Sequence, residues 1–393
     1  MLKAKNAASG SPTRRRVLIA GAGAGIGLTT VTACARDAEP PEDARGPGFH
    51  GPRQAGVTTP RQATVLLLSY DLDPGLRGAA GARALKAVFE AWTDALARTT
   101  GSDASRAARL TATVGIGPGL PARLGLRAPA ALRGLPPFPG DRLDPAGSGG
   151  DVLVQLCADS TDATEATGET LTRLAGDALH ARWRQDGFLP PASDGGAPRD
   201  LLGFRDAPSG LTPEECERWV WSGNATCLVV RRVHLRIEDF ARLAEHRQEE
   251  IVGRRRSTGG PLDGGSGNAA AGNAGAGLPS GTARDAHGAP VRSHARARDA
   301  HGAPVRSHAR AVDPALDGGA RMLRRAYSYA DSPTDQGMLF LAFMRDPALF
   351  ARVQRRMAAQ DELSGFMEAR GSAVAHVLPG ARPGRPLGAD LLG

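Results

Sequence analysis

Histidine is the residue type whose arrangement in this chain first points to chemistry. Residues 283–296 are repeated without change as residues 297–310, and a list of the histidines in the two copies reads His287, His294, His301 and His308. A neutral imidazole is a common metal ligand, and it also titrates near neutral pH. The unit is too short to be a solenoid repeat and indicates a recent duplication. Because the local peptide occurs twice, only the flanking sequence distinguishes one copy from the other.

Two other features that could carry chemistry fail on spacing. Cys157, Cys216 and Cys227 lack the spacing of metal ligands, so we expect buried or free thiols. The glycine-rich run 21–27 departs from the G-x-G-x-x-G pattern and lacks an ordinary strand before it. It therefore does not predict a dinucleotide site. With four cysteines in all, the chain has no disulfide framework.

The N-terminal residues read as a targeting segment. Arg14, Arg15 and Arg16 precede a weakly apolar stretch, residues 17–33, in the manner of a twin-arginine signal peptide. This export route carries folded proteins and suits one that acquires a cofactor first. Residues 31–34 resemble a lipobox, so Cys34 is either a lipidation site and membrane tether or lies near a plain cleavage site. We expect a signal peptide over 1–34, a solvated linker over 35–48, and an extracellular, periplasmic or cell-surface location.

Length and composition limit the remaining possibilities. The chain has 393 residues, which suggests two domains, and a hydrophobic fraction of 41% is enough for real cores. No apolar run beyond the first 35 residues approaches the ~20 residues of a membrane span. The net charge is +8, but Lys3, Lys5 and Lys86 are the only lysines and all other basic residues are arginines. This preference for arginine over lysine indicates a compositional bias of the coding sequence and not selection for binding an acidic partner. We therefore expect no nucleic-acid partner.

The elements that must position these residues alternate between strand and helix patterns. In the first half, strands are predicted at 63–70, 110–116 and 151–157, and helices at 80–99 and 161–183. In the second half, strands are predicted at 219–233 and 338–344, and helices at 236–252 and 347–369. Residues 117–150 read as a long loop and residues 257–282 as a flexible segment. The recurrence indicates an α+β fold with two similar halves.

From about residue 48 to its C-terminus, the chain resembles the dye-decolourising peroxidases, specifically the exported, deferrochelatase-like branch. Seven segments carry the resemblance, in this order: Phe49-His50-Gly51 with Gln54-Ala55-Gly56; Phe138-Pro139-Gly140-Asp141 with Gly149-Gly150-Asp151; Leu202-Gly203-Phe204-Arg205-Asp206; Gly253-Arg254 with Gly259-Gly260-Pro261-Leu262; Ser307-His308-Ala309-Arg310; residues 322–329; and residues 337–346. The resemblance implies two ferredoxin-like halves with antiparallel sheets, of the dimeric α+β barrel type, and one haem b in the C-terminal half. It implies that hydrogen peroxide oxidises dyes, phenolics or similar bulky electron donors.

The resemblance also assigns site residues. His308 is implied as the proximal iron ligand, since Arg310 and Pro314 follow it as the family pattern expects. His294, in the upstream copy, is the rival ligand. We expect His287 and His301 to be exposed loop histidines.

On the other side of the haem, the resemblance implies one carboxylate and one guanidinium. Asp206 is the acid/base that moves the peroxide proton, although outside the family pattern it would read as a turn or capping residue. Arg324 is implied to stabilise the charge that develops as the O–O bond breaks, the alternative for it and for Arg325 being a surface or propionate contact. Arg325 points to the opposite face if the segment is extended. Asp361, within a predicted helix 353–369, is the partner implied for the proximal histidine.

The chain departs from the family pattern at Ala207, at Ala326 and in the duplication that inserts fourteen residues beside the proximal ligand, and these departures keep alternatives open. Ala207 replaces a glycine, and Ala326 offers no polar group near Arg324. Both favour an exported haem-binding or haem-processing protein with little peroxidase turnover. A basic exported polyanion-binding protein that never holds haem is the remaining alternative.

The expected organisation follows from these assignments. Residues 49–212 form the N-terminal ferredoxin-like domain and residues 213–393 the C-terminal haem-binding one. Residues 257–310 are a flexible insertion within the latter. Surface aromatics such as Trp219, Trp221 or Tyr327 are candidates for passing electrons, but they read equally well as packing residues. A homo-oligomer is compatible with the sequence.

Overall fold

The computed structural model of the protein describes residues 48–192, 196–205, 210–262 and 307–393. Its strands are β1 (Thr64–Leu72), β2 (Thr111–Ile116), β3 (Val152–Ala158), β4 (Leu179–Phe188), β5 (Thr226–Leu235), β6 (Leu323–Ser332), β7 (Asp335–Met344) and β8 (Met367–Val377). Its α-helices are α1 (Gly78–Gly101), α2 (Asp103–Ala107), α3 (Leu120–Leu124), α4 (Thr161–Ala175), α5 (Pro213–Trp219), α6 (Ile237–Ala241), α7 (Glu245–Val252), α8 (His308–Ala311), α9 (Ala348–Gln360) and α10 (Ala389–Leu392). The described residues also contain two 3₁₀ turns, η2 (Pro314–Asp317) after α8 and η3 (Glu362–Phe366) after α9.

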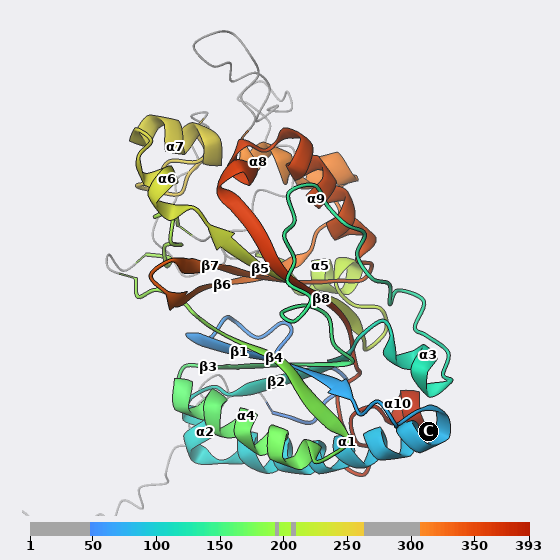
Figure 1. Ribbon diagram of the computed structural model, residues 1–393. Helices are drawn as coiled ribbons and strands as arrows, with labels where there is room; N and C mark the ends of the chain where they lie inside the picture. Colours follow the sequence, from blue (N-terminus) through green and yellow to red (C-terminus); the bar gives the residue numbers. More distant parts are fainter. Residues whose placement is uncertain (1–47, 193–195, 206–209, 263–306) are drawn as a thin grey trace, which may run out of the picture. The chain divides into compact units, whose positions relative to one another are not determined.

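The strands close into one antiparallel barrel in the order β1-β3-β2-β8-β5-β7-β6-β4 (Figure 1). Strands β1 to β4 form one half and β5 to β8 the other, and each half has the antiparallel strand order of a ferredoxin-like unit. The halves join where Gly115 pairs with Val377 and where Phe188 pairs with Ser328. The predicted α+β fold with two ferredoxin-like halves is confirmed.

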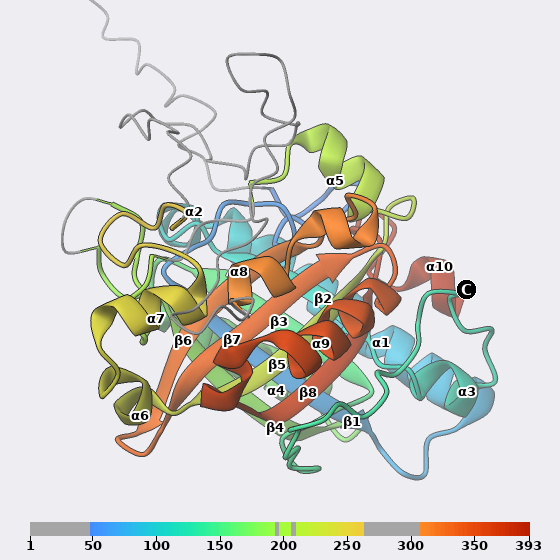
Figure 2. The same cartoon turned by 90° about the horizontal axis from the view of Figure 1, so that it is seen from above.

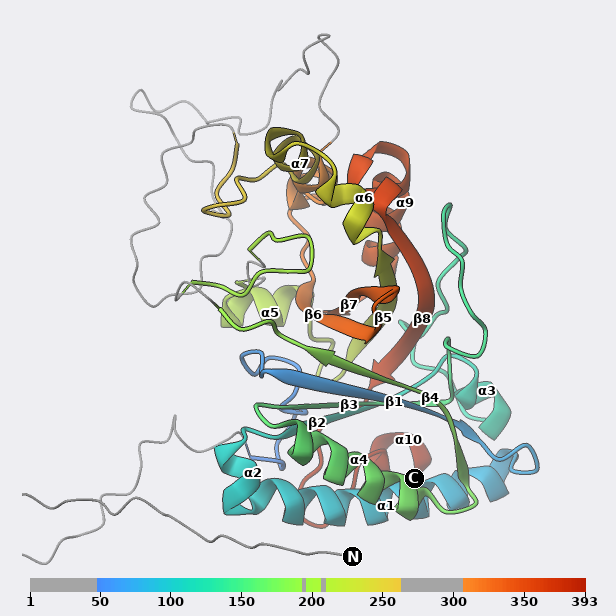
Figure 3. The ribbon, with the colours of Figure 1, turned by 60° about the vertical axis from the view of Figure 1, so that its left-hand side comes forward.

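The N-terminal half has apolar residues on both faces of its sheet because both faces are covered. Every residue of β2 and β3 is buried. On the outer face lie α1 and α4, side by side (Figure 3). Trp92 of α1 packs at this interface, and its indole N–H donates to the Leu171 carbonyl of α4 at 2.9 Å. The helical spacing predicted from Leu85 to Leu96 therefore marks the core-facing side of α1.

In the C-terminal half, one face of the strands lines the barrel interior and the other face packs against helices. One face of β5, β6 and β7 fills the barrel interior with Val230, Tyr327 and Leu341. On the opposite face, Val229 and Ala342 pack against Phe350 of α9. Figure 2 shows α8 and α9 lying across the strands of this half. Side chains that alternate along β6 consequently point either into the barrel or toward these helices.

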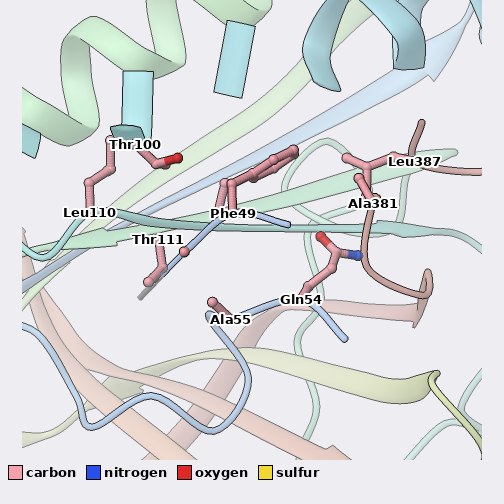
Figure 4. A pocket seen from close by; sticks show the side chains of 10 residues that line it. Phe49, Gln54, Ala55, Thr100, Leu110, Thr111, Ala381 and Leu387 are labelled. Atoms are coloured by element: carbon pink, nitrogen blue, oxygen red, sulfur yellow. The ribbon is translucent and has the colours of Figure 1, made fainter. Parts of the chain in front are cut away.

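Two cavities lie away from that helix-covered face. One is near Phe49, Gln54 and Leu387 (Figure 4), and its volume of about 10 Å³ suits a single water at most. The other, of about 270 Å³, opens at the end of the barrel interior, beside Trp183 and Arg232.

Several predicted element ranges are wrong. The helix predicted over 236–252 is divided into α6 and α7, and the loop predicted over 117–150 contains α3. The helix predicted over 161–183 ends at Ala175, because Gly176 caps it with φ +53°, and β4 follows. Residues 213–219 form α5, opened by a capping box of Thr212 and Glu215, so the strand predicted from residue 219 begins only at Thr226. The helix predicted over 347–369 ends at Gln360, and β8 starts at Met367.

Both ends of the predicted insertion 257–310 belong to the described structure. Ser257 accepts a hydrogen bond from Arg205, and His308 begins α8. Residues 263–306, which include His287, His294 and His301, lie outside the described residues, as do Cys34 and the rest of segment 1–47. Within the described ranges, no helix combines the length and hydrophobicity that a membrane crossing requires.

Candidate active site

His308 meets a buried carboxylate. It is the first residue of α8, and its Nδ1 lies 2.7 Å from Oδ2 of Asp361. The Asp361 side chain is 0% exposed, whereas that of His308 is 25% exposed. The ionised carboxylate can only accept, so Nδ1 carries the proton and Nε2 is left as the atom able to bind a metal. A histidine whose second nitrogen donates to a carboxylate is the usual arrangement of a metal-bound imidazole.

Asp361 is held by the backbone around it. It lies between α9 and η3 rather than inside the predicted helix 353–369. Its Oδ1 accepts the backbone N–H of Leu363 at 2.9 Å, which leaves Oδ2 for His308. The helix break therefore fixes the carboxylate in the orientation that the histidine uses.

Contacts of α8 with its neighbours hold His308 in place. Arg356 of α9 donates to the Ala311 carbonyl at 2.6 Å and to Asp317 at 2.7 Å. Gly253 lies against the other side, since a Cβ there would meet Ser307 Oγ at 2.8 Å and Ala309 Cβ at 2.9 Å. The short helix is thus packed between α9 and the end of α7.

Arg324 and Arg325 occupy opposite faces of β6, as the alternation predicts. Arg324 pairs in register with Ala342, on the face that α9 covers. Arg325 is 3% exposed and points into the barrel, where it donates to Thr59 O and to Gln62 Oε1. Val312, directly after α8, packs in the same cluster as Ala342. Arg324 and the His308 segment therefore belong to one side of the C-terminal sheet.

Asp206 and Ala207 lie outside the described residues, but the segment leading to them is fixed. Asp200 Oδ1 accepts the backbone N–H groups of Leu202 and Phe204 at 3.0 and 2.9 Å. Phe204 is buried in a cluster that includes Leu363, two residues beyond Asp361. The segment that ends at Arg205 and the segment that carries Asp361 therefore pack in one cluster.

The donor set fits a haem better than a metal held by protein alone. Among the described residues, no group of three or more His, Cys, Asp or Glu side chains could enclose a metal ion. A single imidazole with a carboxylate behind it suits an iron whose other in-plane ligands come from a porphyrin. The residues present therefore fit a haem on the His308 side of the sheet.

Comparison with known protein families agrees with this fold. Residues 54–189 match the model of the Dyp-type peroxidase N-terminal domain, and residues 197–382 match that of the C-terminal domain. The chain belongs to the Dyp-type peroxidase family. It is a haem-binding peroxidase that uses hydrogen peroxide and an electron donor.

Individual relatives cover nearly the whole chain. A dye-decolorizing peroxidase of Thermobifida fusca is 32% identical over 86% of this chain and 83% of its own length. A deferrochelatase of Escherichia coli is 28% identical over 94% of both chains. The oxyferrous complex of DtpA from Streptomyces lividans superposes with a TM-score of 0.75 and 32% identity, over 90% of this chain and all of that one. A DyP-type peroxidase from Cellulomonas bogoriensis gives 0.73 and 32%, over 88% and 98%.

Some expectations about other residues are corrected or confirmed. Trp221 and Tyr327 are 3% and 2% exposed, so they are not surface aromatics. Cys157, Cys216 and Cys227 are buried free thiols, as expected. Burial raises the pKa of the Cys227 thiol to about 12, which makes it a poor nucleophile at neutral pH. Residue spacing in the sequence did not predict the hydrogen bonds of Arg356 to Ala311 and Asp317, because these partners lie about forty residues away in sequence.

Replacing Asp361 with asparagine tests the histidine–carboxylate pair. An amide cannot supply the negative charge that makes the imidazole electron-rich, so we expect haem affinity to fall by about 10–100-fold. The midpoint potential of the bound haem should rise as well. Glu362→Gln is the matched control, because this neighbouring carboxylate pairs with Arg247 instead. Equal potentials in the two variants would contradict the pairing.

Proposed function

We propose that this peroxidase is an exported haem b enzyme that oxidises dyes, phenolics or similar bulky donors. The single observation that carries the site is the 2.7 Å contact between His308 and the buried Asp361. His308 Nε2 would hold the iron, and Asp361 keeps the ring in one tautomer and one orientation. His294 is the competing ligand.

The chemistry assigned to the chain's own residues is proton movement and charge stabilisation. Haem, when bound, would supply the centre that takes oxidising equivalents from peroxide and passes them to donors, which each give up one electron at a time. Asp206 accepts a proton from one oxygen of hydrogen peroxide and donates it to the other oxygen, which leaves as water. Arg324 stabilises the negative charge that grows on that leaving oxygen. Arg325 takes no part, because it points into the barrel.

The cellular setting is proposed from the sequence. The twin arginines before residues 17–33 support export of the folded, haem-loaded protein. Cys34 would tether the protein to a membrane if it is lipidated. The two halves, 49–212 and 213–393, are the proposed domains, and a homo-oligomer is compatible with them.

A second candidate is a haem-binding or haem-processing protein with low peroxidase turnover. The observations that favour it are Ala207 and Ala326, which depart from the family pattern. The match to a protein named deferrochelatase also supports it.

Stopped-flow mixing of haem-loaded protein with hydrogen peroxide, followed by an anthraquinone dye, separates the two candidates. The peroxidase proposal expects a rapid spectral change and catalytic bleaching of the dye. A haem spectrum that peroxide leaves unchanged on the timescale of seconds would support the haem-processing protein. Protein that takes up no haem at all would leave the polyanion-binding alternative.

A further inference from the structure

Arg254 follows the glycine that packs against the His308 helix. Gly253 ends α7 in a left-handed conformation, with φ +79°. Gly253 lies so close to Ser307 and Ala309, the two neighbours of His308, that a Cβ at position 253 would clash with both. Arg254 therefore directly follows, in sequence, the residue that packs against the segment carrying the proposed iron ligand.

The other end of the Arg254 side chain reaches the segment that leads to Asp206. Its Nη1 donates to the carbonyl oxygen of Gly259 at 3.0 Å. Gly259 in turn lies against Arg205, with a Cβ position 3.2 Å from Arg205 Cβ. Arg254 thus connects Gly253, which packs against the His308 helix, with Gly259, which packs against Arg205. Arg254 therefore lies between the segment that carries His308 and the segment that leads to Asp206.

The guanidinium of Arg254 has a carbonyl partner but no carboxylate partner among the described residues. Nearby Arg247, by contrast, forms ion pairs with Glu250 and Glu362. Burial lowers the pKa of the Arg254 guanidinium below its ordinary value, although arginine stays protonated at neutral pH. A half-buried cation without an anion is costly unless a ligand supplies the charge.

We propose that the Arg254 guanidinium binds a propionate carboxylate of the haem. A guanidinium forms two parallel hydrogen bonds with a carboxylate, so this contact fixes the haem at its edge while His308 holds the iron. Arg254 is a haem-anchoring residue, not an acid/base. The inference rests on the proposed function only in requiring that haem binds on the His308 side.

The test is a spectrophotometric titration of apoprotein with haem b and with its dimethyl ester, which lacks both carboxylates. We expect Arg254→Gln to weaken haem b binding by about 10–100-fold, as loss of a charge-assisted pair does. The same substitution should leave dimethyl ester binding nearly unchanged. Arg254→Lys should restore part of the lost affinity. Arg255→Gln, a change at the exposed neighbouring arginine, is the control and should bind both forms like wild type.

The outcomes separate the possibilities. Equal weakening for both haem forms would overturn the proposal in favour of a purely structural role for the 253–261 turn. No weakening with haem b would also overturn it. If Arg254→Gln fails to fold, the wild-type preference for haem b over the ester and its reduction in Arg254→Lys decide the question. A wild-type protein that binds neither form, or binds them independently of His308, would contradict the proposed function instead.

Discussion

Replacing Arg324 with leucine lowers the second-order rate constant for reaction of the haem-loaded protein with hydrogen peroxide by about 10²–10³-fold. The guanidinium is a permanent charge on the helix-covered face of β6, and leucine cannot stabilise the anion that develops as the O–O bond breaks. The resting haem spectrum should stay close to that of wild type, because the proximal contacts are untouched. Stopped-flow absorbance at the Soret band measures the rate directly.

Arg325→Leu is the matched control for this prediction. It removes the same charge one residue along the same strand, but on the barrel-interior face. There it strips Thr59 O and Gln62 Oε1 of a donor, which should cost about 1–3 kcal/mol of stability. Thermal unfolding should therefore occur at a lower temperature while the peroxide rate per folded, haem-loaded molecule is retained. A slow Arg325 variant beside a fast Arg324 variant would reverse the assignment of the two arginines.

Replacing Asp206 with asparagine should slow the same reaction by about 10²–10⁴-fold, which is the usual contribution of a positioned general acid–base. Asparagine has nearly the same shape but can neither accept the peroxide proton nor return it. Haem affinity should be largely retained, so the loss appears in the rate and not in the loading.

The control for Asp206 is Asp313→Asn, the same change at an aspartate whose contact the structure describes. Asp313 caps η2 by accepting the backbone N–H of Ala315, and an asparagine can accept that bond equally well. Its peroxide rate should match wild type. An Asp206 variant that reacts within a few-fold of this control would place the proton transfer on another group.

The sequence predicted most of the N-terminal half because its signals are local. The apolar spacing in 80–99 located α1, and runs of branched residues located β1, β2 and β3. It missed β4, β6 and β8, whose residues alternate between a buried face and a polar or charged one. In β4, for example, charged residues interrupt the run and are bonded to other strands or loops. Strand pairing of this kind depends on partners far away in sequence, which a local pattern does not contain.

The candidate site was predictable in part. Period-two alternation separated Arg324 from Arg325, but only the fold shows which face meets the helices. Asp361 was named from the resemblance, while the helix break that aims it at His308 is a tertiary feature. Arg254 entered only as part of a segment that carries the resemblance, and no role followed from it. Its contact with Gly259, and that of Gly253 with residues 307 and 309, form only when the chain folds.

The absorption and electron paramagnetic resonance spectra of ferric haem in wild type, His308→Ala and His294→Ala test the assignment of the iron ligand most directly. We predict that wild type and His294→Ala share one histidine-ligated high-spin signature, and that His308→Ala alone loses it. Added imidazole should partly restore the signature in His308→Ala. Loss of the signature in His294→Ala, with His308→Ala unchanged, would contradict the assignment and move the ligand to the other copy of the repeat.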